Sequence, residues 1–94
     1  MKIRFDCDEK YFKNKDLLEL LKVVDFSNLE KVPLISENRD GSFSMEFDND
    51  ELFEVKMAIN DEILSQGLER QNKVNEIGRM LYWLYDEVLI QTRI

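Results

Sequence analysis

The chain has 94 residues, with 20 acidic and 13 basic side chains, no histidine and a single cysteine. This length fits one domain spanning residues 1–94, and the net charge of −7 argues against direct binding to nucleic acid, which requires clustered Lys and Arg. The composition also excludes an internal disulfide, a thiolate zinc site and a histidine general base. Leu, Ile, Val and Phe supply 31 residues, enough for a packed core.

The amino-terminal part predicts a strand followed by a helix. Ile3 and Phe5 alternate with charged neighbours, which indicates a short strand over residues 2–7. The next segment has apolar residues at the helical spacing i, i+3, i+4 and i+7, namely Leu17, Leu20, Leu21 and Val24. We therefore expect a helix over residues 14–24, with Asn14 as its N-cap.

The middle of the chain predicts a meander of three antiparallel strands over residues 32–37, 42–48 and 52–59. Pro33 confines the first of them to an edge or a strand start, and Asp40-Gly41 marks a turn. The apolar residues of the other two strands alternate in matching phase, so Phe47 would face Phe53 across a polar turn.

A helix competes with the third strand. Leu52, Val55, Ile59 and Ile63 also fit helical spacing, and Asp48 with Glu51 could form a capping box. We favour the strand because its alternation continues that of the preceding strand. A short helical turn over residues 61–66 would follow, ending at Gly67.

The carboxy-terminal segment predicts a long helix, capped by Asn72 and running to about Thr92. Its apolar stripe has 3,4,3,4 spacing and consists of Val74, Ile77, Leu81, Leu84 and Val88. The expected fold is therefore a small α+β domain of order β-α-β-β-β-α, with a three-stranded antiparallel meander packed by an N-terminal helix and the long C-terminal helix.

The acidity is concentrated in one segment. Residues 40–69 contain nine acids and one base, a net charge of −8, whereas the other residues contain 11 acids and 12 bases, a net charge of +1. This segment could simply keep a sheet edge solvated. The alternative is a docking surface for a basic protein. Its candidate binding residues are Glu46, Asp48, Asp50, Glu51, Glu54, Asp61 and Glu62.

The sequence predicts neither a metal site nor an enzyme, and no cofactor. Asp48 and Asp50 begin like a calcium-binding EF-hand loop, but Leu52, Phe53 and Ile59 occupy positions where that loop needs two ligands and a glycine. Cys7 lies between two acids, which raises the pKa of its thiol, and no His is present to activate it.

Trp83 and Ile90 lie seven residues apart, on the side of the last helix opposite its core stripe, with Arg79 on the same side. Strand 2–7, the first helix or the C-terminal tail could cover this tryptophan. Otherwise it belongs to a self-association or partner surface, because tryptophan often anchors interfaces. A homodimer through this helix is the alternative to the acidic interface.

No motif identifies a family. The short chain, the acidic segment and the aromatic helix resemble, in general style, small inhibitors encoded by phages or mobile elements, including anti-CRISPR proteins and other DNA mimics. Such a protein would be non-catalytic and would block a nucleic-acid-binding protein such as a defence nuclease. The chain shows no stretch long and apolar enough for a signal peptide or membrane span, so we expect no membrane partner. The lone Cys7, flanked by two aspartates, fits a reducing compartment, so we expect a cytoplasmic location.

Overall fold

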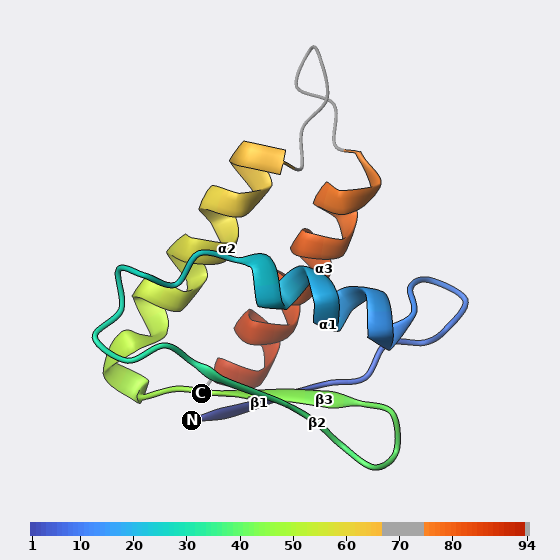
Figure 1. The fold of residues 1–94 in the computed structure, drawn as a ribbon, viewed down its shortest axis with the longest axis horizontal. Coiled ribbons are helices and arrows are strands. Elements are labelled where there is room, and N and C mark those ends of the chain that lie inside the picture. The colour runs from blue at the N-terminus through green and yellow to red at the C-terminus, as the bar shows by residue number, and fades with distance from the viewer. Residues whose placement is uncertain (67–74, 94) are drawn as a thin grey trace.

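The fold is a three-stranded antiparallel sheet with its helices on one side (Figure 1). The computed structural model describes residues 1–66 and 75–93. In chain order the elements are β1 (Lys2–Phe5), α1 (Asn14–Val23), β2 (Leu34–Glu37), β3 (Phe43–Glu46), the 3-10 helix η1 (Asn49–Glu51), α2 (Leu52–Gln66) and α3 (Glu76–Thr92). The predicted α+β class is confirmed, but the observed order is β-α-β-β-α-α.

The sheet has the strand order β1-β3-β2, so β3 is central and the amino-terminal strand completes the sheet. Met45 of β3 pairs with Ile3 of β1 and with Ile35 of β2, and all three side chains belong to the core or pack against it. The β2–β3 hairpin agrees with the prediction. It turns at Gly41, whose φ of 89° is a conformation that glycine adopts without strain.

The predicted strand over residues 52–59 is wrong, because these residues form the first half of α2. Val55 and Ile59 are buried in both interpretations, so they did not distinguish strand from helix. Ile63, fully buried one turn later, continues the helical series, whereas Phe53 and Met57 of the expected strand are exposed. The helical turn expected over 61–66 is the continuous end of α2.

The capping details also differ from the predictions. Asp48 is at the N-cap position of η1 without a side-chain capping bond, so the capping box with Glu51 does not form. Lys13, not Asn14, is at the N-cap of α1. The predicted cap Asn72 is outside the described residues, and α3 is capped by Asn75, which accepts a hydrogen bond from the Gly78 amide at 2.8 Å.

One hydrophobic core joins the sheet to the three helices. Phe5 of β1 stacks on Phe43 of β3 with ring centroids 4.9 Å apart. The helices cover this face with fully buried aliphatic side chains, which are Leu17 and Leu21 of α1, Val55, Ile59 and Ile63 of α2, and Leu81, Leu84 and Val88 of α3. One side of α2 therefore packs into the core, and its opposite side faces solvent.

Candidate acidic interface

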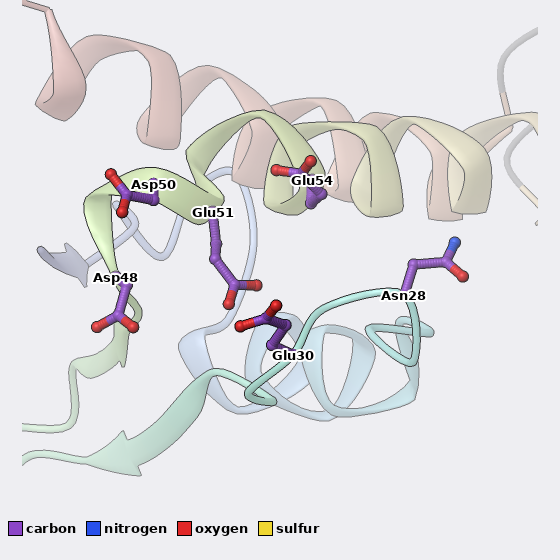
Figure 2. Close-up of a pocket in the computed structure, with 6 residues that line it drawn as sticks. All are labelled: Asn28, Glu30, Asp48, Asp50, Glu51 and Glu54. Carbon is purple, nitrogen blue, oxygen red and sulfur yellow. The ribbon is translucent and has the colours of Figure 1, made fainter.

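Five carboxylates line one open depression, of about 450 Å³, where the end of β3 turns into α2 (Figure 2). The lining residues are Asn28 and Glu30 from the loop between α1 and β2, Asp48 and the η1 residues Asp50 and Glu51, and Glu54 from the first turn of α2. Figure 2 shows the side chains of Glu30 and Glu51 directed toward each other across the depression.

Buried neighbours fix the two segments that carry these acids. Phe47 is buried just after β3, and its backbone is bonded in both directions to Met1, at 3.0 and 2.9 Å. On the other side, Leu29 is buried and its amide donates to the carbonyl of Phe26 at 3.1 Å, while Pro33 is buried just before β2. The acids therefore project from anchored backbone.

No lysine or arginine of residues 1–66 and 75–93 forms an ion pair with these carboxylates. The two ion pairs of that part of the chain join Arg4 to Asp6 and to Asp40, at the other end of β3. Five like charges that line one depression repel each other, to an extent limited by solvent and salt. The depression therefore concentrates negative charge that no ion pair of the described residues neutralises.

The structure brings together four of the seven predicted acids. Asp48, Asp50, Glu51 and Glu54 share the depression, although the polar turn expected between strands 42–48 and 52–59 does not exist, because residues 52–66 form α2. Glu46 lines a neighbouring depression with Asp48. Asp61 and Glu62 lie further along α2, where Glu62 accepts a hydrogen bond from Gln66 at 2.6 Å.

Sequence reasoning missed Glu30. It is 18 residues before Asp48 in the chain and lies in a loop without periodic pattern, so no local signal placed it beside η1. Its position depends on how the α1–β2 loop packs through Leu29 and Pro33, which only the folded arrangement reveals.

A second depression of about 230 Å³ adjoins the first and shares Asp48 with it. Two aliphatic side chains on its wall are strongly exposed, Val32 at 71% and Leu34 at 66%. Lys31 also lines it and is the basic residue nearest in sequence to Glu30. The acidic surface therefore has an apolar border on the β2 side.

The described carboxylates do not form a metal centre. Within residues 1–66 and 75–93, no group of three or more Cys, Asp or Glu side chains is arranged to hold a metal ion.

Cys7 is buried, and this burial, more than the neighbouring Asp8, raises the pKa of its thiol. A raised pKa keeps the thiol protonated and weakly nucleophilic.

Trp83 and Ile90 have different surroundings. Trp83 is half-buried, and its ring centroid lies 6.2 Å from that of Phe5. Strand β1 therefore partly covers the tryptophan, which agrees with the alternative that strand 2–7 covers it. Ile90 is 62% exposed and Arg79 is exposed as well. The part of the last helix left open is thus centred on Ile90 more than on Trp83.

Comparison with known proteins gives no relative. The chain matches no family model, and neither a curated protein nor a solved structure resembles it significantly. Within the described part of the chain, each helix is too short or too polar to cross a bilayer.

Proposed function

We propose that this protein is a non-catalytic binding module whose acidic depression docks a basic surface of another protein. The observation that carries the proposal is that five carboxylates line one depression and that no cation of the described residues is paired to them. These carboxylates belong to Glu30, Asp48, Asp50, Glu51 and Glu54. A partner that supplies Lys or Arg relieves the repulsion and accelerates association by electrostatic steering.

The apolar border supports a protein partner in particular. Interfaces combine a hydrophobic centre with charged and polar groups around it. Val32 and Leu34 are exposed beside the acids, and Asp48 belongs to both depressions. A protein surface can cover the aliphatic side chains and neutralise the carboxylates at the same time, which a small cation cannot do.

Within this class, we favour a nucleic-acid-binding protein as the partner and inhibition as the outcome. Grooves that bind phosphate backbones are lined by Lys and Arg, and carboxylates on a rigid scaffold can occupy such a groove in place of phosphates. A defence nuclease is one such target. The lone, buried Cys7 supports a cytoplasmic setting, since secreted domains of this size commonly use disulfides.

The test is capture of partners from a host lysate by tagged protein at low and high salt, read by mass spectrometry. The triple variant Asp48→Lys/Asp50→Lys/Glu51→Lys reverses the sign of the charge at three of the five acidic positions that line the depression. The matched control Glu9→Lys/Glu19→Lys/Asp86→Lys changes the net charge equally at exposed positions elsewhere. We expect a basic partner that wild type and the control retain at low salt and that the depression variant loses. Equal capture by all three proteins would contradict the proposal.

A second candidate function is a homo-oligomeric regulatory module that associates through α3. The observation that favours it is the 62% exposure of Ile90 on a helix whose Tyr82 is also 42% exposed. Light scattering on wild type and Ile90→Glu separates the candidates. A dimer that Ile90→Glu dissociates would support self-association, and a monomer in both cases would eliminate it.

A further inference from the structure

The side of α2 that faces away from the core carries an exposed apolar stripe. Phe53 is 65% exposed, Met57 41% and Leu64 63%. The buried residues of the same helix, Val55, Ile59 and Ile63, point into the core. These three exposed side chains contribute nothing to that core, so their clustering on one line needs a separate reason.

The stripe is straight and long. With about 100° and 1.5 Å per residue, Phe53, Met57 and Leu64 lie within about 40° of one another around the helix axis and extend over roughly 16 Å. A second helix is the element that contacts another helix along such a line, because ridges of side chains fit into grooves over several turns. Met57 suits this role, since its flexible side chain adapts to different partner shapes.

The two flanks of the stripe differ in charge. Glu54 and Asp61 lie about 60° to 80° from its centre on one side, and Lys56 lies on the other side. Glu54 also lines the acidic depression, so the acidic flank of the stripe adjoins the depression. Charge complementarity therefore specifies a partner whose apolar residues are bordered by Lys or Arg.

We propose that the exposed face of α2 docks a basic amphipathic helix of the partner protein. The stripe receives its apolar residues, and Glu54, Asp61 and the adjoining depression receive its Lys or Arg side chains. This inference rests on the proposed function and names the element that the partner presents. The affinity comes mainly from the apolar face, while the acids select the orientation and the sign of the partner's charge.

A second copy of this chain fits the face poorly. Antiparallel pairing of two α2 helices about a dyad places the Glu54–Asp61 flanks of both copies on the same side, where they repel. Parallel pairing opposes that flank with a single Lys56 of the other copy. Each arrangement leaves unneutralised acids, in addition to the net charge of −7 that each copy carries.

The probe is a pair of synthetic, helix-stabilised peptides of about 18 residues, roughly 27 Å long. The patterned peptide has Leu residues on one line and Arg residues along one flank. The rearranged peptide has the same composition with its Leu residues distributed around the helix. Binding to ¹⁵N-labelled protein is followed by amide chemical shifts and by fluorescence anisotropy, at low and high salt.

We expect the patterned peptide to bind about tenfold more tightly than the rearranged one, because only it buries the stripe. The amide shifts should extend along residues 53–64. The variant Phe53→Ser/Leu64→Ser should lose the preference. The control Tyr11→Ser/Val23→Ser, at positions 65% and 60% exposed, should keep it.

Three outcomes would contradict one or both proposals. Equal, salt-sensitive binding of both peptides, with shifts confined to residues 48–54, would overturn the helix-docking face and leave the acidic interface standing. A patterned preference that survives Asp48→Lys/Asp50→Lys/Glu51→Lys at unchanged affinity would overturn the proposed function and leave the apolar face standing. Absence of binding by either peptide at low salt would overturn both.

Discussion

The side-chain amide of Gln91 pairs with the backbone of Arg4 as a neighbouring strand would. Gln91, at the end of α3, accepts from the Arg4 amide through Oε1 at 3.0 Å and donates through Nε2 to the Arg4 carbonyl at 2.6 Å. Arg4 belongs to β1, an edge strand. This arrangement satisfies an edge that could otherwise pair with another chain, and it ties the last helix to the first strand.

Replacing Gln91 by Ala should lower the free energy of unfolding by about 1 kcal/mol, since its two exposed hydrogen bonds to Arg4 are lost. Gln66→Ala is the control, because among the described residues the Gln66 side chain bonds to Glu62 of the same helix and to no other residue. Urea denaturation measures both. An unchanged midpoint for Gln91→Ala would show that this contact contributes nothing to stability.

The helical state of residues 52–66 predicts effects of very different size at two positions close in sequence. Ile59→Ala should destabilise the fold by about 2–5 kcal/mol, because Ile59 is fully buried. Met57→Ala, on the exposed side, should change stability by less than about 0.5 kcal/mol. Denaturant unfolding of the two variants tests this difference, and equal losses would contradict the burial that the fold assigns to them.

Asp40 makes the stability of the fold depend on pH in the acidic range. It accepts hydrogen bonds from the Ser42 hydroxyl, from the Ser42 amide at 3.0 Å and from Arg4 at 2.6 Å. The first of these is the largest cause that lowers its pKa from 3.8 to about 2. Because the folded state binds this proton more weakly than the unfolded chain, the stabilisation is complete above about pH 4 and is lost toward pH 2.

Unfolding of wild type and Asp40→Asn should therefore be compared between pH 2 and pH 6, a window set by the lowered pKa of about 2. We expect the difference in free energy between the two proteins to shrink as the pH falls below about 4. A difference that is constant with pH would mean that Asp40 stabilises the fold by its shape alone.

Glu30 provides a test of the repulsion within the isolated protein. Its side chain is directed toward Glu51 in the acidic depression. Glu30→Gln should raise the free energy of unfolding by a few tenths of a kcal/mol at low salt, about the scale of exposed charge pairs, and the gain should vanish at high salt. Glu9→Gln, at an exposed position elsewhere, should show no such gain. Destabilisation by Glu30→Gln would contradict the repulsion.

The elements with a single consistent pattern were predictable from the sequence. Helix α1 and the end of α3 at Thr92 agree with the apolar periodicity, and the β2–β3 hairpin agrees with its Asp-Gly turn. The strand prediction for residues 52–59 failed because Val55 and Ile59 fit both the two-residue alternation of a strand and the spacing of a helix. The deciding residue, Ile63, was assigned to a separate turn.

Part of the acidic depression could not be predicted because it depends on tertiary contacts. Glu30 lies beside the other acids because its loop is anchored by Leu29, and no local pattern encodes that placement.

Asn14 was expected to cap α1, but its side chain accepts a hydrogen bond from the Cys7 amide and donates to Asp6 and to the Gly41 carbonyl. It thereby connects two loops that are distant in sequence.

The most direct test of the central claim is the salt dependence of the affinity for a purified partner. Wild type and Glu9→Lys/Glu19→Lys/Asp86→Lys should weaken in parallel as salt rises. Asp48→Lys/Asp50→Lys/Glu51→Lys should bind far more weakly at low salt and show little salt dependence, because the charges that salt screens have been reversed. Identical affinity and an identical salt slope for the three proteins would contradict a docking role for the acidic depression.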